Sequence, residues 1–378
     1  MTALLSGIRV LELSRILAGP WAGQVLADMG AEVIKVENPN GGDDTRTWGP
    51  PFVTDAEGNP IKDMSAYFLC ANRGKTSVLI DFTQPEGQEM VRQLAASCDV
   101  VIENFKVGGL VKYGLDYESL KAVNPKLVYA SITGFGQDGP YAHRAGYDFM
   151  IQGLGGLMSL TGQPDGEPVK VGVALTDVLT GLYTAIGVLG ALHHAQATGQ
   201  GHHVDIALLD VQVATLANQA LNYLVGGKAP KRLGNSHPNI VPYQAFPTSD
   251  GHIILAVGND GQFTRFCTVA GHPEWAADDR FTSNPSRVAH RAILVPLVAE
   301  ALSARPSHDW LAALEEVGVP AGPINDIAQV FADPQVIARG LKIEQTLEDG
   351  TVLPGVGSPI VVDGQRMVAD APPPRLGS

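Results

Sequence analysis

The sequence predicts an α/β protein, with a parallel β-sheet covered by helices in a large first domain and a smaller α+β domain after it. Two observations carry this prediction. Short apolar stretches alternate with helical patterns through the first half of the chain, as in repeated βαβ units. After about residue 225 the chain is rich in Gly, Pro and Asn, and then changes to a hairpin pattern followed by helical patterns.

The first βαβ unit is predicted at the start of the chain. A strand at 8–14 (IRVLELS) is followed by a helix at 19–30 (GPWAGQVLADMG) and a second strand at 32–37 (EVIKVE). Pro20 lies near the first turn of this helix and Gly30 ends it, which are the preferred positions of these two residues. We therefore expect two parallel strands joined by a helix.

Further strands and helices follow in alternation. Strands are predicted from Thr76, Asp99 and Leu127, and helices from Pro85 and Tyr117. Strands that are this short and apolar are typical of a parallel sheet that helices cover on its faces.

The second domain is predicted from its turns and helices. Residues 249–251 (SDG) separate two β-prone runs, which predicts a hairpin, and three helical patterns follow it. We expect a large domain at 1–224, a small domain at 225–320 and a C-terminal segment of strands and turns at 321–378.

The composition narrows the function. Hydrophobic residues make up 45% of the 378 residues, which is enough for a sizeable core. The formal net charge of −13 argues against nonspecific nucleic-acid binding, so any anion site must be a local basic patch. Cys70, Cys98 and Cys267 are far apart and show no CxxC pattern, so we expect neither a structural metal nor a disulfide framework.

The location is predicted from two segments. The N-terminus lacks the basic and apolar regions of a signal peptide. The apolar stretch after Asp177 is the nearest approach to a membrane span, but its Gly and polar residues favour a buried helix. We therefore expect a cytoplasmic protein without a membrane partner.

Basic residues gather in loops at predicted strand ends. The turn after the first strand, SRILAGPWAG, lacks the GxGxxG of dinucleotide-binding proteins, which disfavours a nicotinamide dehydrogenase. Each basic residue alone is an ordinary solvated charge, but the set is suited to phosphate groups. The set comprises Arg15, Arg46, Arg73, Lys75, Lys106, Lys112 and Arg144.

Asp177 stands at the start of an apolar helical pattern, LTDVLTGLYTAIGVLGALHH. Thr176 or Asp177 can cap this helix, which contributes about 1 kcal/mol. A carboxylate there also meets the positive end of the helix dipole, which keeps it ionised. It can then attack an acyl carbon and form a covalent intermediate, beside N–H groups that stabilise an oxyanion. The pattern alone leaves cap and nucleophile open.

The histidines do not predict a metal site. His193, His194, His202 and His203 lie at a helix end and in a polar turn, without the spacing of metal ligands, so no metal is expected. His237 lies in GNSHPN, a loop of small residues. Such a loop either closes over a ligand or is a plain surface turn.

Five motifs follow one another along the chain: GIRVLELSRILAGPWAGQVLADMGAEVIKVE, GDDTRTWGPPF, NRGKTSVLIDF, VVIENFKVGGLVKYGLDYESL and ASITGFGQDGPY. Together they resemble the class III CoA-transferases, a family that includes formyl-CoA transferase, carnitine CoA-transferase and the 2-methylacyl-CoA racemases. The resemblance covers essentially the whole chain. It implies a Rossmann-like large domain built from both chain ends, a small domain between them, and two such rings interlocked as a homodimer.

The resemblance also implies the site. The catalytic aspartate of the family falls on Asp177, which favours the nucleophile over the cap. Coenzyme A is then a substrate, and no permanently bound cofactor is implied. The implied coenzyme A contacts are Arg15, Leu17, Ala18, Asn72, Arg73, Lys75, Asn104, Phe105, Lys106, Lys112, Arg144, Tyr147 and Asp148.

Tyr147 separates two activities within the family. Racemases resemble AGHD where this chain has AGYD at 145–148. Removal of an α-proton near neutral pH suits His, with a pKa near 6.5, and does not suit Tyr, with a pKa near 10. We therefore expect a transferase, with a 2-methylacyl-CoA racemase and a non-catalytic CoA-binding protein as the alternatives.

The acceptor is predicted by analogy. LGNSHPNIVPYQAFPTSDGHIILAVGNDGQF and VGVPAGPINDIAQVFADPQV resemble the branch that acts on dicarboxylates such as succinate and glutarate. Asn235 or His237 would bind the distal carboxylate, in a loop that acts as a lid. CoA would then move from succinyl-CoA, or a similar thioester, to a dicarboxylate through an aspartyl anhydride and an aspartyl-CoA thioester on Asp177.

Overall fold

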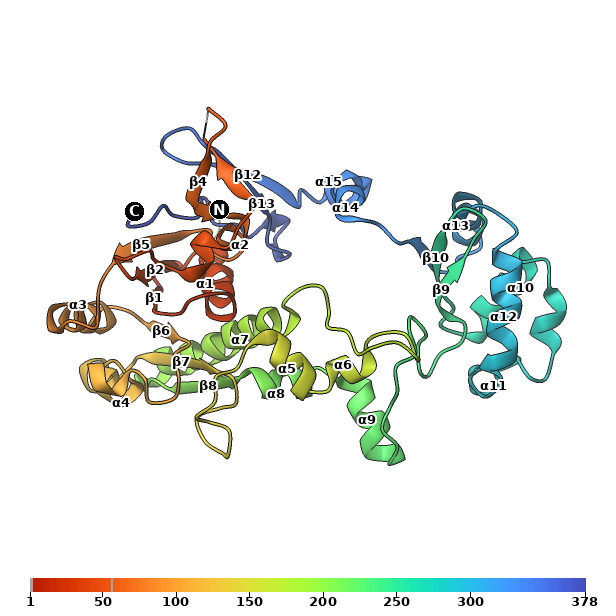
Figure 1. Cartoon of the computed structure of the whole chain (residues 1–378), viewed down its shortest axis with the longest axis horizontal. Coiled ribbons are helices and arrows are strands. Elements are labelled where there is room, and N and C mark those ends of the chain that lie inside the picture. Colours follow the sequence, from red (N-terminus) through yellow and green to blue (C-terminus); the bar gives the residue numbers. More distant parts are fainter. Residues whose placement is uncertain (1–2, 56) are drawn as a thin grey trace. The chain divides into compact units, whose positions relative to one another are not determined.

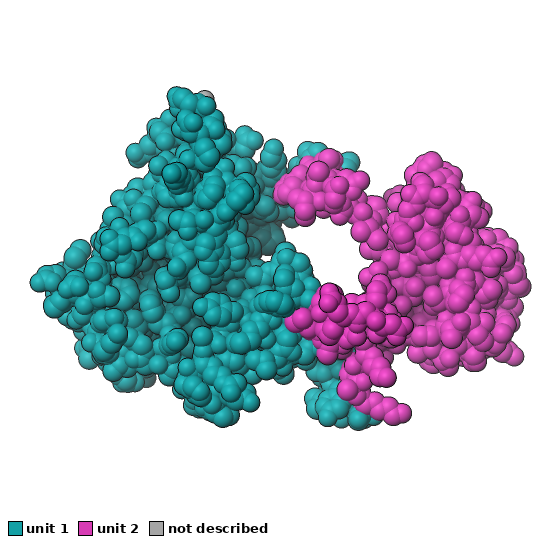
Figure 2. Space-filling model, in the orientation of Figure 1, with its two compact units in different colours: residues 1–157, 170–227, 334–378 teal, residues 158–169, 228–333 magenta. Residues whose placement is uncertain are grey.

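A computed structural model of the chain describes residues 3–55 and 57–378. The chain divides into two compact units, each with its own hydrophobic core (Figure 2). Unit 1 comprises residues 1–157, 170–227 and 334–378, and unit 2 comprises residues 158–169 and 228–333.

Unit 2 differs from the predicted small domain in three ways. It begins at 228 rather than 225, it ends at 333 rather than 320, and it includes the separate segment 158–169. That segment is joined to unit 2 by Arg232, which donates to the carbonyl oxygens of Gln163 and Gly166. Hydrogen bonds between segments this far apart in the sequence cannot be predicted from local sequence patterns.

Unit 1 is built on a six-stranded parallel sheet in the order β5-β2-β1-β6-β7-β8 (Figure 1). The predicted α/β class and the predicted strands are confirmed, and β8 is an addition to them. The strands are β1 (Arg9–Glu12), β2 (Glu32–Glu37), β5 (Lys75–Leu79), β6 (Val100–Glu103), β7 (Val128–Thr133) and β8 (His203–Ala207).

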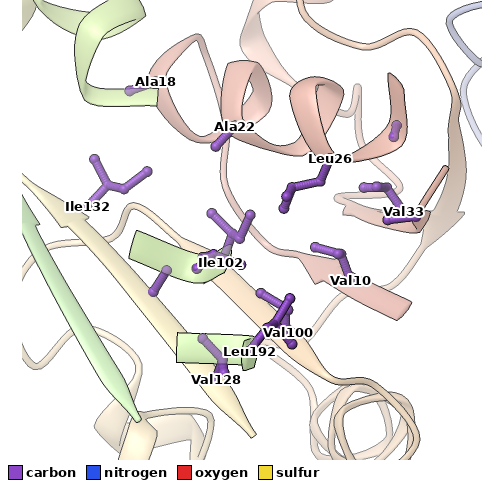
Figure 3. Close-up of a cluster of buried hydrophobic side chains, with 14 of the residues drawn as sticks. Val10, Ala18, Ala22, Leu26, Val33, Val100, Ile102, Val128, Ile132 and Leu192 are labelled. Carbon is purple, nitrogen blue, oxygen red and sulfur yellow. The ribbon is translucent and has the colours of Figure 1, made fainter. Parts of the chain in front are cut away.

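Helices cover both faces of this sheet. Alternate residues of a strand point to opposite faces, so Val10 and Leu11 of β1 belong to different cores. The core that contains Val10 is completed by α1 (Ala18–Asp28) and α7 (Leu175–Thr198), as Figure 3 shows for Leu26 and Leu192. The core that contains Leu11 is completed by α3 (Pro85–Ala96) and α4 (Tyr117–Val123).

α7 is long and apolar enough to cross a membrane by length and composition, but it packs against the sheet and α1 along one face. Gly181 permits the contact with α1, since a Cβ there would lie 2.6 Å from the carbonyl oxygen of Ala18. The prediction of a buried helix is wrong for the other face, where Leu182, Tyr183 and Ile186 are exposed within the chain.

Shorter elements complete unit 1. They are η1 (Asp44–Thr47), β3 (Phe52–Thr54), β4 (Pro60–Ser65), α2 (Ala66–Leu69), η2 (Val111–Tyr113), α5 (Asp148–Leu154), α8 (Leu208–Ala214), α9 (Ala217–Gly226), α15 (Pro334–Ala338), β12 (Lys342–Thr346), β13 (Val352–Val356), β14 (Val361–Val362) and β15 (Gln365–Arg366), with α6 (Leu157–Leu160) at the unit boundary.

Unit 2 is an α+β structure. Its antiparallel sheet has the order β11-β10-β9, and the predicted hairpin is confirmed in β9 (Tyr243–Pro247) and β10 (His252–Ala256). The core contains Phe246 and Trp310, and the indole N–H of Trp310 donates to a backbone carbonyl at 2.8 Å. The remaining elements are β11 (Ala321–Pro323), α10 (Asp260–Val269), η3 (Pro273–Ala277), α11 (Asn284–Ala289), α12 (Arg291–Leu302), α13 (Ser307–Glu316) and α14 (Ile327–Ala332).

Candidate active site

A cavity of about 590 Å³ opens at the carboxyl ends of the parallel strands in unit 1. The strand order reverses there, between β1 and β6, which is the place where open α/β sheets bind ligands. Many of the predicted site residues line this cavity, although they come from separate segments. They are Arg15, Leu17, Ala18, Asn104, Phe105, Lys106, Lys112, Arg144, Tyr147 and Asp177.

The loops that follow β1 and β6 are held together at the cavity. The N–H of Arg15 donates to Asn104 Oδ1 at 2.9 Å, and Asn104 Nδ2 donates to the carbonyl of Arg15 at 2.7 Å. The Arg15 guanidinium pairs with Asp44 at 2.8 Å, which adds the loop after β2. These contacts fix the cavity wall on both sides of the strand reversal.

Three basic side chains of the cavity have no acidic partner. Within residues 3–55 and 57–378, no ion pair involves Lys106, Lys112 or Arg144. Lys112 lies 4.6 Å from the ring centre of Tyr113, and Arg144 lies 4.0 Å from that of Tyr141. An acidic protein therefore presents unpaired cations at one cavity, which suits a phosphate-bearing ligand.

Asp177 is the third residue of α7, and its carboxyl group reaches the cavity. The helix is not capped by Thr176 or Asp177, because Ala174 occupies the N-cap position. Asp148, the first residue of α5, supplies the cap instead. Its Oδ1 accepts from the N–H of Thr176 at 2.8 Å and from the N–H of Asp177 at 3.3 Å. The Asp177 side chain is thereby left available for chemistry.

Asp148 is itself held by a chain of polar contacts. Gln152 Nε2 donates to Asp148 Oδ2 at 2.7 Å, and Gln152 Oε1 accepts from the N–H of Val171 at 2.9 Å. Thr176 Oγ1 donates to Gln212 Oε1 at 2.7 Å. Asp148 is not among the cavity-lining residues, and its role as a coenzyme A contact stays a prediction.

The electrostatics of Asp177 also differ from the prediction. Burial of the carboxyl group raises the pKa of Asp177 to about 7, and the nearby Asp148 carboxylate adds to the increase. The sequence argument expected the helix dipole to keep Asp177 ionised. With a pKa of about 7, part of the Asp177 carboxyl group is instead protonated at neutral pH. A nucleophilic role requires the carboxylate, so any such reaction must slow as the pH falls below about 7.

Asn72, Arg73 and Lys75 are buried inside unit 1 and do not line the cavity. Arg73 forms two bonds to Asp28, at 2.9 and 2.7 Å, and Lys75 Nζ donates to Asn72 Oδ1 and pairs with Glu12. They lie outside this cavity, and their role as coenzyme A contacts stays a prediction. Asn72 and Arg73 precede β5 and Lys75 is its first residue, so all three lie at its amino end, opposite the ligand-binding edge. Arg46 is likewise buried, against Glu37 at 2.6 Å.

Asn235 and His237 lie in unit 2, in the loop before β9. The N–H of Asn239 donates to His237 Nδ1 at 3.1 Å, which leaves Nε2 as the donor of a neutral ring. Arg291 Nη2 donates to the carbonyls of His237 and Pro238, at 3.1 and 2.7 Å. The loop is therefore braced by a cation of α12.

Several cavity residues were missed by the sequence argument. Asn38 follows β2, while Asp81, Phe82 and Thr83 follow β5, so all of them lie at carboxyl ends of strands. Phe82 packs edge-on against Phe105 and Tyr113, with ring centres 5.8 and 5.6 Å apart. Their positions directly after predicted strands could have identified them. The sequence argument weighed mainly the basic residues at those positions and so passed over the others.

Comparisons with known proteins agree over the whole chain. The family described as CoA-transferase family III matches residues 5–378. The succinate–glutarate CoA-transferase of Agrobacterium fabrum is 57% identical over 99% of this chain and 93% of its own length. The human succinyl-CoA:glutarate CoA-transferase is 44% identical over 99% and 83%. The crystal structure of a CAIB/BAIF family protein from Brucella suis is 56% identical, with a TM-score of 0.87 over 100% of this chain and 97% of that one.

Proposed function

Since this chain belongs to CoA-transferase family III, we propose that it moves CoA from succinyl-CoA, or a similar acyl-CoA, to a dicarboxylate such as glutarate. The choice of acids follows two relatives, the succinate–glutarate CoA-transferase of Agrobacterium fabrum and the human succinyl-CoA:glutarate CoA-transferase. The observation that carries the proposal in this chain is the half-buried Asp177 beside unpaired cations in one cavity.

Asp177 is the proposed nucleophile. A carboxylate oxygen of Asp177 attacks the thioester carbonyl, the C–S bond breaks, and an aspartyl anhydride and CoA thiolate result. The thiolate attacks the Asp177 carbonyl carbon and releases the donor acid, which leaves an aspartyl-CoA thioester. The acceptor carboxylate attacks the carbonyl of this thioester, which breaks the C–S bond, releases CoA thiolate and forms a new anhydride. The thiolate then attacks the acyl carbon of that anhydride. Asp177 is regenerated, and one thioester has replaced another.

The cavity is proposed to hold coenzyme A. Lys106, Lys112 and Arg144 are unpaired cations for its phosphates, and the aromatic group of Phe82, Phe105 and Tyr113 offers a flat apolar surface for its adenine. The first turn of α1 adds backbone N–H groups that no carbonyl of the helix accepts, which suit a developing oxyanion.

Replacing Lys112 with Ala is expected to raise the KM for acyl-CoA about tenfold, because one charge-assisted contact to phosphate is lost. The value of kcat should change little, since the contact is the same in ground and transition states. Lys121→Ala is the matched control, because Lys121 is an exposed lysine of α4 outside the cavity. Equal effects of both substitutions on KM would contradict the assignment.

Replacing Asp148 with Asn is expected to move the acidic limb of the pH dependence of kcat/KM to lower pH. In the wild type this limb should lie near pH 7, where Asp177 takes up a proton. Asn keeps an oxygen for the N–H groups of Thr176 and Asp177 but removes the charge that raises the pKa of Asp177.

Rate profiles between about pH 5 and pH 9 measure the shift, with Asp148→Ala as the comparison. Ala also removes the cap and should lower the free energy of unfolding by about 1 kcal/mol. An acidic limb at the same pH in wild type and Asp148→Asn would show that Asp148 has no electrostatic influence on the nucleophile.

The acceptor site is proposed in the loop that carries Asn235 and His237. His237 Nε2 and the amide of Asn235 are the donors suited to the distal carboxylate of the acceptor. Arg291 braces the loop through two carbonyls, and we propose that the loop acts as a lid that excludes water from the hydrolysable anhydride.

The active form is proposed to be a cytoplasmic homodimer of interlocked rings. Large apolar side chains remain exposed within the chain along α5, α7 and α9 of unit 1, and Leu224 and Val225 are 72% and 85% exposed. Large exposed apolar side chains in such number are typical of a protein–protein interface. A second copy of the chain is the partner that the family resemblance implies.

Replacing Leu224 and Val225 together with Glu is expected to halve the molar mass in solution, because buried unpaired charges disfavour association. Light scattering coupled to size-exclusion chromatography gives the mass. Met90→Glu on α3 is the control, since Met90 is an exposed apolar residue on a different helix. A wild-type protein that elutes as a monomer at assay concentration would overturn the dimer.

The acids are tested by product analysis. Incubation with succinyl-CoA and glutarate should yield glutaryl-CoA and succinate in equal amounts, and monocarboxylates should be poor acceptors. Exchange of an α-proton with solvent deuterium, without acid exchange, would instead indicate the racemase. Binding of acyl-CoA without turnover of any acid would indicate the non-catalytic protein.

A further inference from the structure

Ile16 has an unusual backbone conformation at the edge of the cavity. Its φ is +72°, in the left-handed region that β-branched residues rarely adopt. It lies between β1 and α1, and residues 15–18 all line the cavity. The conformation costs roughly 1–2 kcal/mol relative to the ordinary regions, so other contacts must hold it.

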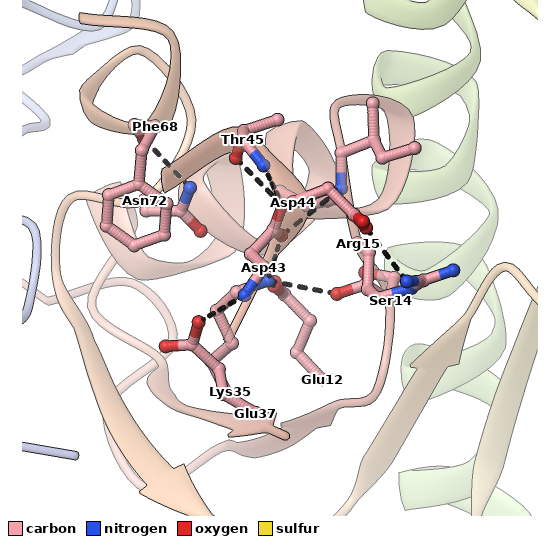
Figure 4. A network of polar contacts seen from close by, with 12 residues as sticks. Glu12, Ser14, Arg15, Lys35, Glu37, Asp43, Asp44, Thr45, Phe68 and Asn72 are labelled. Carbon is pink, nitrogen blue, oxygen red and sulfur yellow. Dashed lines mark hydrogen bonds and ion pairs between the residues drawn. The ribbon is translucent and has the colours of Figure 1, made fainter. Parts of the chain in front are cut away.

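Asp43 is the side chain that contacts this turn. Both carboxylate oxygens lie within hydrogen-bond distance of the Ile16 N–H, at 3.2 and 3.1 Å. Asp43 follows β2 and is fully buried, and it also accepts from the N–H of Thr45 (Figure 4). Asn104 fixes the neighbouring backbone of Arg15 through its two bonds. The strained residue is therefore held from two separate loops.

A buried ion network fixes Asp43 in turn. Lys35 Nζ lies 2.9 Å from Asp43 and 2.9 Å from Glu12, and it donates to the carbonyl of Ser14 at 2.9 Å. Lys75 Nζ pairs with the same Glu12 at 2.8 Å. Figure 4 draws Lys35, Asp43 and Glu12 in one network with the turn that carries Ser14 and Arg15.

The network also contacts the start of α1. Lys75 Nζ donates to the carbonyl of Pro20 at 2.9 Å. Gly23 leaves room for Glu12, because a Cβ there would lie 1.9 Å from Glu12 Oε2. The same charges thus bond to the backbone at Ser14, Ile16 and Pro20, on both sides of the strained residue.

We propose that Asp43 is a positioning residue, which holds Ile16 in its left-handed conformation and so places the start of α1 against the coenzyme A site. The inference rests on the proposed function, since it assigns Asp43 to the same cavity. Lys35 and Lys75 are both buried and paired with acids, and their contacts hold the turn in place.

The test is a rescue experiment with matched variants. Asp43→Ala is expected to weaken CoA binding about tenfold, as the strain at Ile16 relaxes and the turn moves. Ile16→Gly allows a φ of +72° without strain, so Asp43→Ala/Ile16→Gly should recover most of the lost affinity. Asp43→Ala/Ile16→Ala should not recover it, because Ala removes nearly the same side chain but keeps the strain. Titration calorimetry with CoA gives the affinities.

The outcomes separate this inference from the proposed function. Recovery with Gly but not with Ala supports the positioning role, while equal affinities in the two double variants overturn it. If Asp43→Ala does not fold, Asp43→Val replaces it in the same four-way comparison, since Val has no acceptor for the Ile16 N–H and leaves a smaller cavity than Ala. A wild type that binds no CoA and transfers none contradicts the proposed function itself, whatever the variants do.

Discussion

Replacing Asp177 with Ala is expected to lower kcat for CoA transfer by a factor on the order of 10⁴ or more, because the covalent route through this carboxylate is removed. CoA binding should stay within about threefold of the wild type, since the cationic and aromatic contacts of the cavity are intact. A steady-state assay and a calorimetric titration separate the two effects.

The control for this substitution is Glu86→Ala, which removes an exposed carboxylate of α3 that is not among the cavity-lining residues. It should retain the activity of the wild type. If Asp177→Ala kept a substantial fraction of the wild-type kcat, the covalent chemistry would have to be placed on another group.

Truncating Arg73 to Ala is expected to lower the free energy of unfolding by about 3–5 kcal/mol, because Asp28 would remain as an uncompensated buried charge. Arg73 holds both oxygens of Asp28 and donates to the carbonyl of Val356 at 3.0 Å, so it joins α1 to β13 of the C-terminal segment. The surviving folded protein should keep the KM for acyl-CoA of the wild type. Denaturant unfolding and steady-state kinetics measure the two quantities.

Arg15→Ala gives the matched comparison. Arg15 lines the cavity, and its pair with Asp44 is about half exposed, so stability should change by less than about 1 kcal/mol while the KM for acyl-CoA rises. The reverse pattern, with a stable Arg73→Ala protein that binds CoA poorly, would restore Arg73 to the coenzyme A site.

Most of the fold could be predicted from local sequence patterns. Two apolar strands and a helical pattern that starts near Pro20 and stops before Gly30 identify β1, α1 and β2, since these signals lie within a few residues of one another. The assignment of 158–169 to unit 2 was not accessible, because it depends on contacts of Arg232 with a segment far away in sequence. The partial exposure of α7 was hidden for a different reason, because an apolar helix has the same composition whether its own chain or a partner covers it.

The site could be predicted from the sequence only where a residue directly follows a strand, because that position places it at the carboxyl edge of the sheet. Asn104, Phe105 and Lys106 follow β6 and line the cavity. Asn72 and Arg73 precede β5, Lys75 is its first residue, and none of these three lines the cavity. The roles of Asp148 and Asp43 depend on distances between separate loops. Their contacts to the backbone of Asp177 and Ile16 have no signature in the order of residues.

The central claim is the covalent role of Asp177, and the intact mass of the protein tests it most directly. The protein is incubated with succinyl-CoA without an acceptor, beside Asp177→Ala, and each sample is then treated with hydroxylamine. The account predicts an adduct of the mass of CoA that hydroxylamine removes and that Asp177→Ala lacks. An adduct that persists in Asp177→Ala, or none with any acyl-CoA of a broad panel, would contradict it.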